Sequence, residues 1–176
     1  MTREEELIKK TGQGDRTAME ELITIYYPEI LRYCLWHAPN RDLAEDAVQE
    51  TFLKMIRYFD TYTHSGKFRA FLYRIAANVC ADMKKRKWMT EVPLEDNAQE
   101  VEYTEYGFAK ADGDLQLLDM VRDLEEEMKE IVLLKFGQDL TLKEIAEVLH
   151  LPMRTVQSRL RRSLKQLRTS LENPNT

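Results

Sequence analysis

Apolar residues recur along most of the chain at intervals of three and four, the spacing that places them on one face of an α-helix. In the first half, this pattern covers residues 22–37, 44–59 and 68–83, with a kink or break expected at Pro28 because proline cannot donate its backbone hydrogen bond. No run of alternating apolar residues predicts a strand. The pattern therefore predicts an all-α fold, with side-chain N-caps for these helices at Asp15, Asn40 and Ser65.

The second half carries three more helical segments, at residues 124–136, 142–149 and 153–171. Thr141 and Glu144 have the spacing of a capping box, which favours a helix start at that point. Two short helices joined by the turn at residues 150–152 predict a helix-turn-helix. The buried stripe expected for the last helix is Val156, Leu160, Leu164, Leu167 and Leu171.

The region between the two halves differs in composition. From Glu91 to Asp114 it holds eight acids and one base, a net charge of −7, together with Pro93, Gly107 and Gly113. Because no helical periodicity is sustained there, it is interpreted as a linker. The expected organisation is a first domain at residues 1–89, an acidic linker at 90–114 and a second domain at 115–176.

The overall composition restricts the class of protein. With 43% hydrophobic and 32% charged residues, the chain is expected to fold as a globular protein. No stretch reaches the roughly 20 apolar residues that span a bilayer, and residues 1–10 lack the pattern of a signal peptide. We therefore expect a cytoplasmic protein without membrane insertion, whose two cysteines, Cys34 and Cys80, are packing residues.

The sequence contains little that would indicate a catalytic site. The sequence has no glycine-rich phosphate loop and no nucleophile motif, and its three histidines lie in separate segments. Cys34 and His37 share a helical face but lack further ligands at zinc spacing. We expect no enzymatic activity, no cofactor and no metal.

The charge of the last helix points to nucleic acid. The net charge of the chain is −5, but residues 150–171 hold six bases and no acid. A helix entering the major groove offers its first-turn side chains to base edges, while later bases reach phosphates. Base-edge candidates are Arg154, Thr155, Gln157 and Ser158; phosphate or partner candidates are Arg159, Arg161, Arg162, Lys165 and Arg168. A solvated basic face is the alternative.

Longer stretches resemble a known family. The segments DLAEDAVQETFLK (42–54) and FRAFLYRIAANVC (68–80) are similar to the paired helices of the polymerase-binding and promoter-melting domain of extracytoplasmic-function (ECF) sigma factors of bacterial RNA polymerase. YYPEI (26–30) fits the first long helices of that family. LKEIAEVL (142–149) and TVQSRL (155–160), with residues 124–136 before them, resemble its fourth conserved region.

The resemblance implies roles for particular residues. The helix beginning at Asp42 corresponds to the one that docks on core RNA polymerase, with Asp46, Gln49 and Glu50 as candidate contacts, although an acidic solvated face is equally compatible. The stretch at 60–68 corresponds to the loop that captures a flipped base of the minus-ten element. Aromatic and cationic side chains suit unstacked bases. The candidates are Tyr62, His64, Lys67, Phe68 and Arg69, followed by Arg74, Asn78, Lys84, Lys85 and Arg86 for the strand backbone or duplex edge. Phe71 is assigned to the core; for Phe68 the choice stays open.

Further partners follow from the resemblance alone. It implies binding to core RNA polymerase, to promoter DNA as duplex and single strand, and to an anti-sigma protein, with the acidic linker in the positively charged path towards the RNA exit. Arg154 and Gln157 stand where family members often have glycine and lysine, so the minus-thirty-five sequence does not transfer. The alternatives are a helix-turn-helix regulator that acts on duplex without polymerase, and an adaptor whose basic helix binds an acidic protein.

Overall fold

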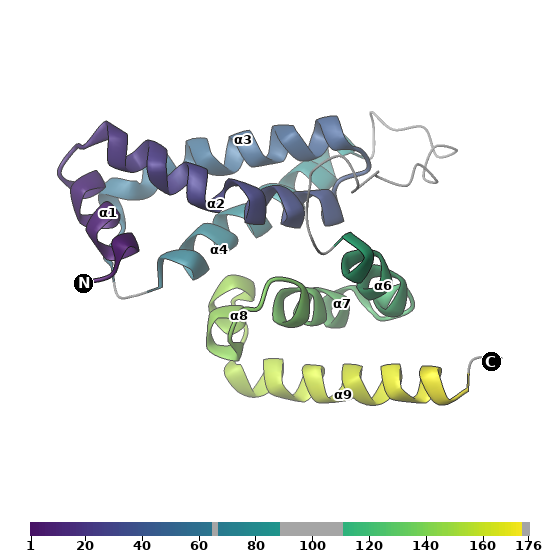
Figure 1. The fold of residues 1–176 in the computed structure, drawn as a ribbon. Helices are drawn as coiled ribbons and strands as arrows, with labels where there is room; N and C mark the ends of the chain where they lie inside the picture. The colour runs from purple at the N-terminus through teal and green to yellow at the C-terminus, as the bar shows by residue number, and fades with distance from the viewer. Residues whose placement is uncertain (65–66, 89–110, 174–176) are drawn as a thin grey trace. The chain divides into compact units, whose positions relative to one another are not determined.

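The computed structural model describes residues 1–64, 67–88 and 111–173. Every regular element in these ranges is helical, and none of them contains a strand. The prediction of an all-α fold is therefore confirmed. The chain divides into two compact units, Met1–Val101 and Glu102–Thr176, which are described separately (Figure 1).

The first unit is a bundle of α2, α3 and α4, which pack on one another, with α1 packed against α2. Figure 1 shows α1 lying across one end of this bundle. Its elements are α1 (Arg3–Gly12), α2 (Arg16–His37), α3 (Arg41–Tyr58), η1 (Phe59–Thr61), α4 (Phe68–Met83) and η2 (Lys84–Trp88).

Two of the three predicted caps are confirmed. The Asp15 carboxylate accepts a hydrogen bond from the Ala18 backbone N–H, and the Asn40 side chain accepts one from Leu43. The Ser65 cap is wrong, because α4 has Lys67 at its N-cap and no side-chain cap bond; Ser65 itself lies outside the described residues. The expected break at Pro28 is also absent from α2, which continues through it to His37.

The core of the first unit explains why α2 survives its proline. Tyr26, Ile30 and Leu31 on either side of Pro28 are buried, so packing of the flanking turns offsets the lost backbone hydrogen bond. Cys34 of α2 and Cys80 of α4 are both buried, with 3.8 Å between their sulfur atoms. They act as packing residues at the contact between the two helices, as expected.

The second unit is built around α9. Both α7 and α8 pack against α9, and η4 contacts α6, α7 and α8. The elements are α6 (Ala111–Val121), α7 (Glu126–Val132), η4 (Leu133–Gly137), α8 (Leu142–Leu149) and α9 (Met153–Glu172). α6 begins inside the last residues of the expected linker, and residues 89–110 lie outside the described part of the chain. The proposed domain limits stay a prediction.

The buried stripe of α9 differs from the expected one. Val156, Ser163 and Leu167 are buried, whereas Leu164 is 43% exposed and Leu171 is 67% exposed. Ser163 occupies the core-facing position because its hydroxyl donates to the Arg159 carbonyl at 2.7 Å, which satisfies the polar group inside the helix.

Candidate nucleic-acid and protein interfaces

The helix-turn-helix is fixed by its own hydrogen bonds. The Thr141 hydroxyl accepts from the Glu144 backbone N–H at 3.1 Å, and the Glu144 carboxylate accepts from the Thr141 N–H at 3.0 Å, which confirms the capping box. At the other end of α8, His150 adopts a left-handed conformation with φ 55°, and the Leu151 N–H donates to the Ala146 carbonyl. These bonds make the turn tight and set the direction in which α9 leaves it.

One face of α9 is polar and exposed. The residues on this face are all exposed: Arg154, Gln157, Ser158, Arg161, Arg162 and Lys165. They follow one another at intervals of three, one, three, one and three positions, so they form a continuous stripe opposite the buried one. Among the described residues, no ion pair involves any of the four cations in this set. The stripe, which we call the α9 basic face, is therefore available to a polyanion.

Two other candidates, Thr155 and Arg159, lie off this face and are half-buried. The Nη1 atom of Arg159 lies 2.8 Å from the Glu127 carboxylate of α7, although it has no well-aligned hydrogen bond among the described residues. Arg168 is paired with Glu172 at 3.2 Å in the last turn. The ion pair with Glu127 thus holds Arg159 within the second unit.

Aromatic rings gather where η1 leads into α4. The Tyr62 hydroxyl is 2.9 Å from His64 Nδ1, and the Tyr62 ring stacks on Phe71 with 4.5 Å between centroids. Phe68 packs behind them and is 1% exposed, so it has no free face for a base and belongs to the core. Phe68 is therefore not a candidate for contact with a base. Phe71, assigned to the core from sequence, is only half-buried.

Arg69 is held within the bundle. Its Nε donates to the Glu29 carboxylate of α2 at 3.2 Å, and its guanidinium lies 5.7 Å from the centre of the Tyr73 ring. The Tyr73 hydroxyl donates to the same carboxylate, and burial, followed by the charge of Glu29, raises the pKa of Tyr73. Arg69 therefore orders the start of α4. Glu29, its partner from 40 positions earlier in the chain, was not singled out from sequence.

The remaining cations of this region lie on α4 and η2. Arg74, Asn78, Lys84, Lys85 and Arg86 are exposed, and Lys67 is half-buried. Arg74 and Asn78 are four residues apart and so share a side of α4. The first unit thus carries a polar, largely basic surface that follows the half-exposed Tyr62, His64 and Phe71.

A second exposed face lies on α3. Asp46 and Gln49 are exposed, and Glu50 is half-buried with Lys54 3.9 Å away. The same side continues into Leu53, 57% exposed, and Ile56, 45% exposed. Sequence reasoning missed these two residues, although their spacing from Gln49 would have placed them there.

Residues 1–64, 67–88 and 111–173 contain no group of three His, Cys, Asp or Glu side chains that could hold a metal ion. None of their helices has the length and apolar character required to cross a membrane.

Comparison with known families matches both units. Residues 22–90 match Sigma-70 region 2, and residues 114–167 match Sigma-70 region 4. Among solved structures, CnrH in complex with the cytosolic domain of CnrY has the same fold, with a TM-score of 0.74 at 18% identity over 99% of this chain and 100% of that one. The sigma factor RpoE of Bartonella quintana, in complex with the anti-sigma factor NepR, gives a TM-score of 0.65 at 19% identity over 88% of this chain and 96% of that one.

Two relatives are similar to this chain over more than nine-tenths of its length. The ECF RNA polymerase sigma factor SigW of Bacillus subtilis is 30% identical over 94% of this chain and 95% of its own length. The ECF RNA polymerase sigma factor BldN of Streptomyces coelicolor is 33% identical over 92% of this chain and 64% of its own length. Since this similarity spans almost the whole chain and almost the whole of SigW, the protein belongs to the ECF RNA polymerase sigma factor family.

Proposed function

We propose that this chain binds core RNA polymerase and directs promoter recognition, strand opening and transcription initiation. The observation that carries the proposal is the near full-length similarity to SigW, which includes both the bundle and the helix-turn-helix unit. A sigma factor of this kind makes no covalent bond itself, so it needs neither a catalytic residue nor a cofactor. Its place of action is the cytoplasm, with the polymerase.

The α9 basic face is the proposed minus-thirty-five contact. Arg154, Gln157 and Ser158 stand in its first turns, where side chains reach base edges in the major groove. Arg161, Arg162 and Lys165 follow along the same side and are placed for phosphates. Four cations on the face would give a salt dependence with a slope of roughly −0.9 for each phosphate neutralised.

The aromatic site of the first unit is the proposed minus-ten contact. Tyr62, His64 and Phe71 offer ring faces for unstacked bases, and the cations from Arg74 to Arg86 would hold the displaced strand. Opening costs about 1.4 kcal/mol for each stacked step on average. Capture of extruded bases biases that opening, which the polymerase also stabilises.

The α3 face is the proposed contact with core polymerase. Asp46, Gln49 and Glu50 supply polar contacts, and Leu53 and Ile56 supply apolar surface that would leave water on binding. An acidic linker at residues 90–114 would suit a path lined with positive charge. Membership of the family also supports an anti-sigma protein as an inhibitory partner.

A regulator that acts on duplex alone is not favoured. It would use the second unit and leave the α3 face and the aromatic site without a role. The two functions differ in what the purified chain does by itself: a regulator binds promoter duplex alone with a steep salt dependence. A sigma factor binds it strongly only after core polymerase is added.

The test measures promoter binding by this chain with and without core polymerase over a range of salt concentrations. We expect tight binding only with core. Arg154→Ala and Gln157→Ala should change sequence preference, whereas Arg162→Ala and Lys165→Ala should weaken binding to all sequences. Binding of the isolated chain that core does not strengthen would refute the proposal.

A further inference from the structure

Helix α9 begins with an exposed apolar side chain. Met153 is the first residue of the helix and is 44% exposed. It stands directly before Arg154, the first member of the α9 basic face. The other members of that face near the helix start, Gln157 and Ser158, are also polar. Met153 would therefore offer DNA a kind of contact that the α9 basic face lacks.

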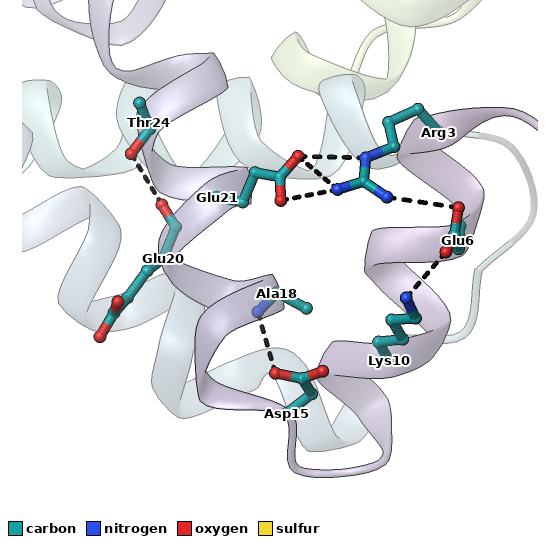
Figure 2. Close-up of polar contacts among 8 residues, drawn as sticks. All are labelled: Arg3, Glu6, Lys10, Asp15, Ala18, Glu20, Glu21 and Thr24. Atoms are coloured by element: carbon teal, nitrogen blue, oxygen red, sulfur yellow. Dashed lines mark hydrogen bonds and ion pairs between the residues drawn. The ribbon is translucent and has the colours of Figure 1, made fainter.

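The start of α9 differs from the starts of the capped helices. At α2 the Asp15 carboxylate accepts a hydrogen bond from the Ala18 backbone N–H, as Figure 2 shows. At α8 the Thr141 hydroxyl closes the first turn in the same way. The N-cap of α9 is Pro152, which is exposed and forms no side-chain cap bond within the described residues. The first turn of α9 is therefore left open to an approaching duplex.

Hydrogen bonds fix the backbone on both sides of Met153. Before it, the Leu151 N–H donates to the Ala146 carbonyl at 3.0 Å and ties the turn to α8. After it, the Val156 N–H donates to the Pro152 carbonyl at 3.2 Å, and the Val156 side chain is buried. The Met153 side chain therefore leaves the helix from a defined position.

Met153 is in register with the base-edge candidates. Gln157 follows it by four residues and Arg161 by another four, so the three side chains lie one above the other on α9. Side chains of a helix lean towards its N-terminus, so Met153 points to the end of α9 that leads. In a helix-turn-helix the N-terminal residues of the second helix contact base edges. Met153 thus extends the base-contacting side by one turn.

The major groove presents one apolar group that matches this side chain. It is the C5-methyl group of thymine, which apolar side chains contact directly. Methionine is unbranched, flexible and polarisable, so it can adapt its surface to a methyl group. Contact between the two would remove apolar surface of both from water, which is favourable.

We propose that Met153 contacts the C5-methyl group of one thymine in the minus-thirty-five element and so selects thymine at that position. The inference rests on the proposed function. It adds an apolar specificity-determining residue to the polar contacts of the α9 basic face.

The chain offers a matched control for Met153. Met120 is the same residue type in the same unit and is also 44% exposed, but it lies on α6. Met120→Ala therefore removes the same atoms at a position outside α9. Two further variants separate apolar character from side-chain length: Met153→Leu keeps an apolar surface, whereas Met153→Gln keeps the length and makes the end polar.

The experiment uses holoenzyme assembled from core polymerase and the full chain, on a promoter found by mapping transcript 5′ ends. Deoxyuridine replaces thymidine at one position of the minus-thirty-five region at a time, on either strand, which removes only the methyl group. Binding is measured by competition between the two DNAs. Because each protein is compared with itself, differences in folding or in affinity for core cancel.

We expect one position where the unchanged chain binds thymine about fourfold more tightly than uracil, the effect of burying one methyl group. Met153→Leu and Met120→Ala should keep this preference, and Met153→Ala and Met153→Gln should lose it. A preference that persists in Met153→Ala, or the lack of any position where the methyl group matters, would overturn the role of Met153 and leave the proposed function intact. Failure of the unchanged chain to direct core to any promoter would overturn both.

Discussion

Arg159 tests whether a cation of α9 contributes to DNA binding or to the stability of the second unit. From sequence it is a phosphate candidate, but its guanidinium lies 2.8 Å from Glu127 on α7 and its side chain is 29% exposed. Replacing it with alanine should therefore affect the stability of the second unit more than DNA binding. Arg162, which is exposed on the α9 basic face, is the matched comparison.

The size of the effect follows from the geometry. At 2.8 Å in water, Coulomb's law gives about 1.5 kcal/mol of attraction. Glu127 is 69% exposed, so solvent screening and the ordering of two long side chains reduce this. Exposed pairs contribute about 0.2–1 kcal/mol in double-mutant cycles. We expect a coupling free energy of about 0.5 kcal/mol.

The assay is a double-mutant cycle of Arg159→Ala and Glu127→Ala in urea denaturation, together with the salt dependence of promoter binding by the holoenzyme. Arg159→Ala should leave the salt slope unchanged, while Arg162→Ala should lower its magnitude by about 0.9. Zero coupling, together with a salt slope that falls equally in both arginine variants, would show that Arg159 contacts DNA phosphate and is not held by Glu127.

Three further predictions concern packing and caps. Thr141→Ala should lower the free energy of unfolding by about 1 kcal/mol in a thermal melt, because it removes the cap of α8. Phe68→Ala should lower the free energy of unfolding by about 3–5 kcal/mol because the ring is fully buried. Phe71→Ala should lower the free energy of unfolding less, because the ring is only half-buried, and should instead reduce promoter opening. Cys34 and Cys80 should react with a thiol reagent only when the chain unfolds, because both are buried.

Each of these has a clear contrary outcome. A Thr141 variant as stable as the unchanged chain would mean that the capping box contributes nothing to α8. Equal loss of stability in the Phe68 and Phe71 variants would place both rings in the core. Rapid thiol reaction in the native state would contradict the packing of α2 on α4.

Local signals in the sequence were sufficient for much of the fold. Apolar spacing located α2, α3, α4 and α8, and short-range side-chain bonds at Asp15 and Asn40 fixed two helix starts. The same capping signal was available at the other end of the chain. Thr2 and Glu5 form the same box as Thr141 and Glu144, so α1 could have been predicted from its first residues.

Other features depend on contacts that spacing does not encode. Ser163 and Leu164 are neighbours in sequence, and only the angle at which α9 packs decides that the serine is buried and the leucine is partly exposed. Arg69 forms an ion pair with Glu29, which lies 40 positions earlier in the chain. Pro28 remains helical because the turns around it are buried. Tertiary packing overrides local preference in all three cases.

The proposed function requires this chain to give core polymerase a promoter specificity that core lacks. The most direct measurement is transcription from fragmented genomic DNA by purified core polymerase with and without the chain, with mapping of transcript 5′ ends. We expect a small set of start sites that share upstream sequences and appear only when the chain is present. Start sites that are identical with and without the chain would contradict it.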